Sequence, residues 1–419
     1  MKKQFLLFIL LSCFGLLKSE IISAQPKPGD LFREYHWKIP EEGEKQVFLR
    51  VGGRMGYRVK PENCPNIKFE GDRIPLDFDF LLEGATKAEV SVQKMLCHEG
   101  TKNLRISVNN NEEIVFPPAP GIPEPQELYI HHYAPTVELP VAQLHTGNGN
   151  FFSLQVDSVH PWNWPQNLIY DVIFRIYYEP DVYADKFDIE AIQQNEENVK
   201  INLTNLSSQK IKTVDYLAKY DGPDMDGDGM YYDWHYYFLR GNIRNHVGSS
   251  FDPPYQTIWD ISWIPDQNKP VWVSARVNFK SGLTYFATPI QIELKRETYS
   301  VELCKPENQE QKWLTRNGEN KESIFINSDI NENTEAKMVF TTWSPGYFNG
   351  IYINDFLVFD REGLRYAFMQ HDIPIKYLNA LNSEENIVKT GKTPKHHGAM
   401  VHGVEVMWPG IMLLVKSKK

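Results

Sequence analysis

Short runs of alternating apolar and polar residues, bounded by Gly, Pro, Asn and Asp, limit most strongly how this chain can fold. An alternation of period two is typical of strands with one buried face. Helical periodicity is nearly absent, and only 182–195 (VYADKFDIEAIQQN) predicts a short connecting helix. The pattern therefore predicts an all-β protein built from antiparallel sandwiches. The clearest predicted strands are 87–96, 104–110, 168–178, 270–279, 288–296, 350–359 and 411–416.

Two distant stretches of the chain follow the same order of features. In each, a strand ends in Asn and turns into a return strand, at Asn109 in 103–116 and at Asn354 in 349–359. Asn tolerates the positive φ that such a turn requires. Each stretch continues with an acidic residue, an apolar residue and Pro (138–140 and 372–374), and then an Asn-rich turn into another strand. This pattern resembles the galactose-binding-like jelly roll, which is common in secreted carbohydrate-active proteins.

The residues between these stretches, 199–297, consist of short strands that end in a strand, a Gly-containing turn and a second strand. This arrangement resembles an immunoglobulin-like sandwich. The predicted fold is thus two jelly-roll-like β-sandwiches flanking an immunoglobulin-like β-sandwich. The expected boundaries are a signal peptide over 1–24, a jelly roll over 25–198, an immunoglobulin-like domain over 199–297 and a second jelly roll over 298–419.

The first residues have the composition of an export signal. Two lysines precede an apolar run over 5–17, which is too short to span about 30 Å of hydrocarbon. Ala24 supplies a small residue for cleavage, so we expect a secreted or periplasmic protein without a transmembrane segment. A lipoprotein acylated at Cys13 is the less favoured alternative. An oxidising compartment permits a Cys64–Cys97 disulfide, but buried free thiols fit these cysteines equally well.

The net charge of −10 disfavours one class of partner. A nucleic-acid-binding protein needs clustered cations to replace the counterions of the phosphates, and the sequence contains no such cluster. Aromatic residues make up 13% of the chain, which suits both sugar stacking and large antiparallel sheets. We therefore expect a poly- or oligosaccharide partner and no nucleic acid; the sequence does not predict an oligomeric state.

The segment DGPDMDGDGMYYD, residues 221–233, is the sharpest local motif. Its alternating carboxylates can converge on one hard cation, and its glycines permit a sharp turn. We expect a structural calcium site here. The predicted ligands are Asp224, Asp226, Asp228, the backbone carbonyl of Met230, and Asp233. The alternative is an acidic turn without a metal.

Aromatic and titratable residues follow this motif directly. On a continuous strand, Tyr231, Asp233, His235 and Tyr237 would share one polar face. His235 and Tyr237 would then serve as proton-transfer groups, and Arg240 is a further catalytic candidate beside them. Arg244 would bind a sugar carboxylate. An ordinary amphipathic strand is the alternative interpretation.

Two further clusters are candidate parts of a saccharide site. His396 and His397 stand in a predicted loop before a strand, and we count them among the catalytic candidates. Trp162 and Trp164 lie in a loop flanked by prolines, where exposed rings can stack on sugars. The alternative for the histidines is structural hydrogen bonding, and the alternative for the tryptophans is packing at the end of the sandwich.

These features support two functions from different classes. The first is a secreted enzyme, a lyase or dehydratase that acts on uronate-containing saccharides by elimination with His and Tyr as acid and base. The second is a non-catalytic glycan-binding or surface-assembly protein, and a glycoside hydrolase is a further alternative. An enzyme predicts that the candidate histidines share one pocket.

Overall fold

The structure is a computed structural model. It describes residues 26–39, 48–52, 56–57, 70–96, 100–158, 166–183, 187–205, 210–308, 310–315, 318–343, 350–360, 368–391 and 403–419. Strands dominate these residues, and the single α-helix among them is α1 (Pro180–Tyr183). The all-β fold predicted from the sequence is confirmed. The expected signal peptide, Cys64 and Cys97 lie outside the described residues, while Cys304 is a buried free thiol.

Two sheets form the N-terminal unit. The first contains the order β1-β11-β5-β9, and the second has the order β4-β10-β6-β7. Short pieces, β2 (Leu49–Gly52), β3 (Gly56–Tyr57) and β8 (His131–Tyr133), extend the first sheet. The bounds of the main strands are β1 (Leu31–Lys38), β4 (Ile74–Leu76), β5 (Ala85–Leu96), β6 (Thr101–Val108), β7 (Ile114–Val115), β9 (Thr136–Leu139), β10 (Asn150–Ser158) and β11 (Gln166–Tyr178).

The C-terminal unit repeats this strand order. Its sheets run β23-β30-β25-β28 and β24-β29-β26-β27. If the corresponding strands of each unit are numbered from 1 to 8, both units give the orders 1-8-3-6 and 2-7-4-5 within the described residues. The bounds are β23 (Tyr299–Cys304), β24 (Asn320–Phe325), β25 (Glu335–Thr342), β26 (Ile351–Ile353), β27 (Phe356–Phe359), β28 (Met369–Pro374), β29 (Glu385–Thr390) and β30 (Met412–Lys418).

The two asparagines of the repeated sequence pattern occupy equivalent positions. Asn109 has a φ of 51° and Asn354 a φ of 48°, so both adopt the left-handed turn conformation. Asn109 Nδ2 donates to Asn150 Oδ1 at 2.7 Å, and Asn354 Nδ2 donates to Asn386 Oδ1 at 2.8 Å. The Oδ1 atoms of Asn109 and Asn354 accept a backbone N–H from the neighbouring strands β10 and β29, respectively. The repeat read from the sequence is therefore a repeat of structure.

A central unit lies between them. One sheet has the order β12-β13-β19, and the strands β14, β20, β21 and β22 belong to the large sheet. The predicted helix over 182–195 is wrong, because β12 forms there and buries Ile189 against the core while its neighbours face outward. The boundary expected at 198/199 falls where β12 pairs with β13. The bounds are β12 (Asp188–Gln193), β13 (Asn198–Thr204), β14 (Ile211–Asp221), β19 (Gln256–Asp260), β20 (Val271–Phe279), β21 (Leu283–Phe286) and β22 (Ile290–Ile292).

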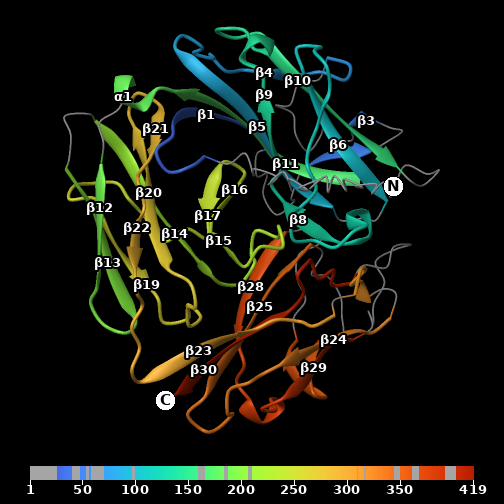
Figure 1. Cartoon of the computed structure of the whole chain (residues 1–419). Coiled ribbons are helices and arrows are strands. Elements are labelled where there is room, and N and C mark those ends of the chain that lie inside the picture. Colours follow the sequence, from blue (N-terminus) through green and yellow to red (C-terminus); the bar gives the residue numbers. More distant parts are fainter. Residues whose placement is uncertain are drawn as a thin grey trace, which may run out of the picture.

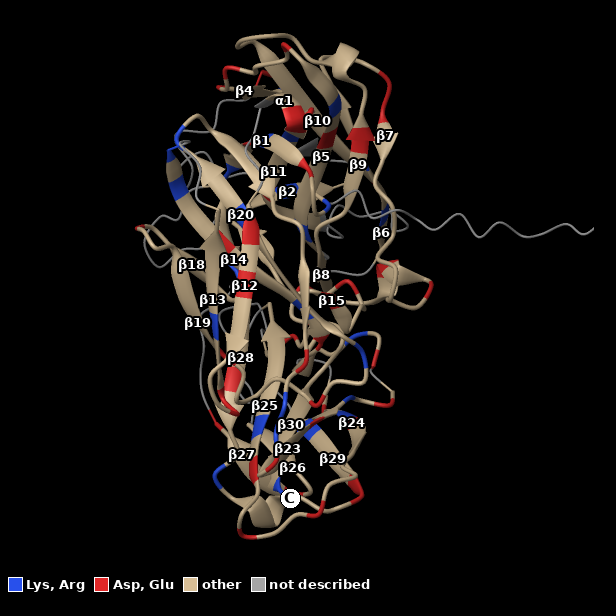
Figure 2. Ribbon diagram, turned by 60° about the vertical axis from the view of Figure 1, so that its left-hand side comes forward, with Lys and Arg blue, Asp and Glu red and all other residues tan. Residues whose placement is uncertain are grey.

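Strand β1 joins the N-terminal and central units. It pairs with β11 on one side and with β21 on the other, so a thirteen-stranded sheet runs through both units within the described residues. One hydrophobic core extends along this sheet, whereas the C-terminal unit has its own core. Figure 2 shows the resulting elongated molecule, with the C-terminal unit at one end and acidic and basic residues interspersed. Among the described residues, no helix has the length and apolar character needed to cross a membrane.

Candidate functional site at the junction of the units

The loop of residues 222–231, between β14 and β15 (Tyr232–Trp234), lies where the units meet (Figure 1). The backbone N–H of Gly121 in the N-terminal unit donates to Asp228 O at 2.9 Å. The side chain of Gln370 in the C-terminal unit donates to Met225 O at 3.1 Å. This loop, called the Asp loop below, therefore contacts both neighbouring units.

Two glycines allow the Asp loop to approach the N-terminal unit closely. Gly227 has a φ of 77° and Gly229 a φ of 86°. A side-chain carbon at Gly227 would overlap His132 O, and one at Gly229 would overlap the backbone of Gly121. Glycine is required at both positions, because any other residue would push the loop away from this contact.

The carboxylates of Asp224, Asp226 and Asp228 converge within this loop. Each offers an oxygen that lies within 4.8 Å of the others. Asp224 accepts the backbone N–H groups of Gly227 and Gly229 at 2.7 and 2.8 Å, which fixes its orientation. Burial, reinforced by the neighbouring carboxylates, raises the pKa of Asp226 well above its usual value. No Lys or Arg among the described residues lies within ion-pair distance of these carboxylates.

Asp233, another expected ligand, is not one of the converging carboxylates, whereas the expected role of the Met230 backbone carbonyl stays a prediction. The Met230 side chain is exposed, and its N–H donates to Asp228 Oδ1 at 2.7 Å. Asp233 accepts the N–H of Trp234 at 2.7 Å and lies 3.9 Å from Lys219 Nζ. Carboxylate oxygens are the donors that Ca²⁺ prefers, so the three converging aspartates fit a hard cation.

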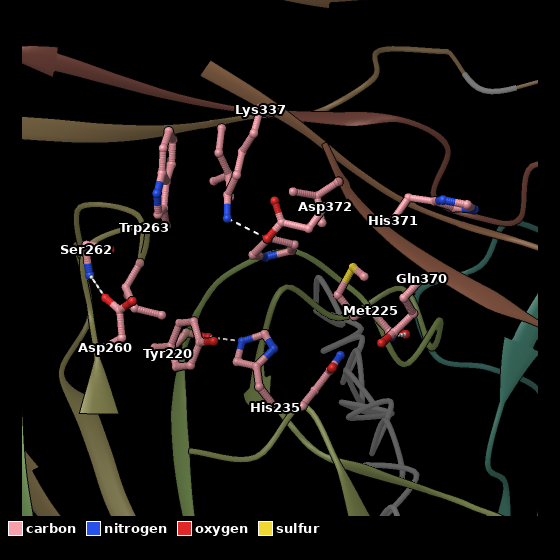
Figure 3. A pocket seen from close by; sticks show the side chains of 15 residues that line it. Tyr220, Met225, His235, Asp260, Ser262, Trp263, Lys337, Gln370, His371 and Asp372 are labelled. Carbon is pink, nitrogen blue, oxygen red and sulfur yellow. Dashed lines mark hydrogen bonds and ion pairs between the residues drawn. The ribbon is translucent and has the colours of Figure 1, made fainter. Parts of the chain in front are cut away.

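A cavity of about 380 Å³ lies beside the Asp loop, between the central and C-terminal units. We call it the junction cavity. Figure 3 shows side chains from both units pointing into it. The part of its lining used below consists of Tyr220, Met225, His235, Asp260, Trp263, Lys337, Gln370 and Asp372.

The outer face of the C-terminal sheet forms one wall. In β25, Ala336 and Met338 face the core, so Lys337 faces the cavity. In β28, Gln370 and Asp372 share the opposite face from the buried His371. Lys337 Nζ lies 2.6 Å from Asp372 Oδ2, and this ion pair is drawn in Figure 3.

The central unit supplies the opposite wall. Trp263 follows the end of β19 and is half-buried, with Lys337 Nζ at 4.7 Å from its ring centroid. Asp260 is exposed and accepts the N–H of Ser262 at 2.9 Å. An aromatic face thus lies next to carboxylates, an ammonium and an amide, a set that can stack on a sugar ring and hydrogen-bond its hydroxyls.

His235 lines this cavity, but its ring is already engaged. Its Nε2–H donates to Tyr220 O at 2.9 Å, and its ring packs on that of Tyr220 with centroids 4.0 Å apart. Burial lowers its pKa, so the imidazole is neutral. The continuous strand expected over 231–237 is wrong, because β15 ends at Trp234 and β16 (Tyr237–Leu239) begins beyond His235.

The other described members of the expected proton-transfer group lie elsewhere. Tyr237 is buried against His132 and Phe368 and lines a separate small cavity of about 30 Å³. Burial raises its pKa well above the usual range. Arg240 is buried with its guanidinium 5.2 Å from the Tyr170 ring centroid, whereas Arg244, in β17 (Asn242–Arg244), is exposed.

The remaining sequence candidates lie outside the described residues. These are the histidines His396 and His397 and the tryptophans Trp162 and Trp164. Their proposed roles stay predictions. Of the described candidates, the structure groups the three aspartates, and it places only His235 in the junction cavity.

Sequence reasoning missed the residues that shape the junction cavity. Trp263 stands in the segment WDISWIP, where its neighbour Trp259 is a core residue, and only the following Pro265 indicates a loop. Asp372 belongs to the repeated sequence pattern at 372–374, and that pattern does not predict a site residue there. These side chains meet only because two sheets distant in sequence face each other.

No protein-family model matches the chain, and no curated protein matches it. Several solved structures are distantly similar. A polysaccharide deacetylase from Bacillus cereus has 16% identity and a TM-score of 0.19, covering 27% of this chain and 31% of that one. A β-porphyranase of glycoside hydrolase family 86 from Bacteroides plebeius has 12% identity and a TM-score of 0.23, covering 56% and 37%.

An FMN-binding β-glucuronidase from Facaelibacterium prausnitzii has 11% identity and a TM-score of 0.22, covering 71% of this chain and 42% of that one. The chain therefore spans less than half the length of these three proteins. Likenesses this distant carry no argument about function, which has to come from the geometry of the site.

Proposed function

We propose that this protein is an exported saccharide-binding protein whose ligand occupies the junction cavity. The observation that carries this proposal is the half-buried Trp263 beside Asp260, Lys337 and Asp372 in a cavity of about 380 Å³. Pockets for small organic ligands have volumes of roughly 300–1,000 Å³ and combine an apolar surface with a few fixed polar groups. The two jelly-roll-like units and the immunoglobulin-like unit would serve to hold the walls of this cavity.

Binding is favoured over elimination by the positions of the described candidates. His235 donates to a backbone carbonyl, Tyr237 lines another cavity, and Arg244 is exposed. Elimination needs a base and an acid that reach the same sugar ring. Because these groups do not line one cavity, the described residues support recognition of a saccharide rather than its cleavage.

We also propose that Asp224, Asp226 and Asp228 hold a calcium ion. The proposal rests on the convergence of three carboxylates that lack a cationic side chain as partner among the described residues. The ion would neutralise these charges and stabilise the Asp loop, which contacts both neighbouring units. Its role would be structural.

A glycan array followed by mass spectrometry of the incubated hits tests the saccharide proposal. We expect the intact chain to retain one or more oligosaccharides at unchanged mass. Trp263→Ala should weaken their binding at least about tenfold, since it removes the aromatic face. Phe251→Ala, which removes an exposed aromatic ring outside the cavity lining, is the matched control.

Three results would contradict the proposal. The array could give no hit, or Trp263→Ala could bind as tightly as the original chain. A product that differs in mass from the added oligosaccharide would show turnover and favour the enzyme hypothesis instead.

A further inference from the structure

Another cavity lies within the N-terminal unit, and no residue lines both it and the junction cavity. It has a volume of about 380 Å³ and is found where the ends of β5, β6, β8 and β11 meet. We call it the Lys94 cavity. Half of its lining residues belong to these strands, and the other half belong to residues 116–127, which include part of the short 3₁₀ helix Gln126–Leu128.

Lys94 places a cation in this cavity without an anionic partner. Its Nζ lies 3.2 Å from His131 Nε2, and His131 Nδ1–H donates to Tyr129 O at 3.1 Å. Because Nδ1 of His131 carries the proton, its Nε2 is an acceptor, and the Lys94 ammonium donates to this neutral imidazole. No carboxylate among the described residues lies within ion-pair distance of Lys94, and burial lowers its pKa to about 8.

The remaining walls restrict the class of ligand further. Phe116 and Pro117 supply apolar surface, while the exposed Glu124 and half-buried Glu127 supply acceptors. A simple inorganic anion would meet Lys94 but would also face these carboxylates. A ligand that carries one carboxylate and several hydroxyls satisfies the whole set, because each hydroxyl donates to an acceptor.

We propose that the Lys94 cavity binds a sugar acid, with its carboxylate against the Lys94 ammonium and a hydroxyl donating to the Glu127 carboxylate. A hydrogen bond between two charged groups is about twice as strong as a neutral one, so Lys94 would select a uronate over the matching neutral sugar. This site goes beyond the proposed function, since it is separate from the junction cavity.

Isothermal titration of the chain with D-galacturonate and with D-galactose tests this proposal. We expect galacturonate to bind at least about tenfold more tightly than galactose. Lys94→Gln should lower the affinity for galacturonate at least about tenfold. Lys210→Gln changes the net charge equally at an exposed site outside the cavity and should leave the affinity unchanged.

Thermal unfolding shows whether the variants fold. Lys94→Gln should melt at or above the original temperature, because it removes a half-buried charge that has no ionic partner among the described residues. Equal affinity for the two sugars, no binding of galacturonate, or full affinity in folded Lys94→Gln would overturn the proposal. Trp263→Ala should leave galacturonate binding to the Lys94 cavity unchanged. The experiment therefore tests the Lys94 cavity independently of the saccharide site proposed for the junction cavity.

Discussion

Glu322, in β24, is a carboxyl group that the fold removes from water. It is 3% exposed, and its Oε1 accepts the N–H of Ile411 at 2.9 Å. Within the described residues, its Oε2 has no hydrogen-bond donor. Burial, with a smaller effect from Glu310, raises the pKa of Glu322 well above 4.5. The folded chain therefore retains a proton that the unfolded chain releases at lower pH.

This difference predicts how Glu322→Gln changes stability. The proton held by the folded state makes unfolding more favourable as the pH rises above about 4.5, so Glu322 destabilises the neutral-pH protein. Glu322→Gln should raise the free energy of unfolding by about 1 kcal/mol or more at pH 7 and have little effect at pH 4. Urea unfolding at both values measures this, with the exposed Glu332→Gln as control. A lower stability at pH 7 would contradict the account.

For individual residues, the sequence predicts the role of some correctly and gives no indication of the role of others. Asn109 and Asn354 were predicted because a tight turn with positive φ is a local requirement. Trp263 and Asp372 were not, because the cavity arises from the packing of two sheets, and no local pattern encodes that packing. The three aspartates were found because their spacing within one loop already brings their oxygens together.

At the scale of elements, a buried charge network ties four strands together across two units. Glu34 of β1 contacts Arg276 of β20, and its Oε1 lies 2.6 Å from Arg175 Nε of β11. Arg175 Nη1 lies 2.9 Å from Glu89 Oε1 of β5. Although burial opposes it, the two guanidinium groups hold the pKa of Glu34 well below its usual range. The network lies where β1 joins the two parts of the sheet.

Removal of the Glu34 charge should destabilise this sheet strongly. Glu34→Gln leaves Arg276 buried without its anion, and breaking a buried ion pair costs about 3–5 kcal/mol. Chemical denaturation should show a loss of this size. Glu113→Gln removes the partly exposed partner of Arg105 and should cost less than about 1 kcal/mol. An equal loss of unfolding free energy in the two variants would mean that the network does not stabilise the sheet where β1 joins the N-terminal and central units.

The predicted elements show where periodicity succeeds and where it fails. The predicted strands over 87–96, 168–178 and 270–279 match β5, β11 and β20 closely, since long alternating or apolar runs favour strands. The helix predicted over 182–195 is wrong, because this polar segment forms an exposed edge strand with few apolar residues and therefore lacks a clear alternation. Pairing with β13 overrides the local pattern there.

At the scale of the whole molecule, the Asp loop should couple calcium binding to stability. Ligand at one hundred times its Kd adds about 2.7 kcal/mol to the free energy of unfolding. The melting temperature should therefore rise as CaCl₂ is added and fall again with a chelator. Asp226→Asn should abolish the rise, because it removes one of the three converging carboxylates, whereas Asp360→Asn, at an exposed site, should retain it.

A melting temperature that does not respond to calcium would contradict this assignment, and so would an unchanged rise in Asp226→Asn. The loop would then be an acidic turn held by its internal hydrogen bonds and by those to Gly121, His132 and Gln370.

The central and C-terminal units together line the junction cavity, and we propose that this cavity binds the saccharide. A crystal structure of the protein with its tightest-binding oligosaccharide tests this assignment most directly. The account predicts a sugar ring against Trp263, with hydroxyls within hydrogen-bond distance of Asp260 or Asp372. An oligosaccharide bound elsewhere on the protein, with Trp263 free of it, would contradict the account.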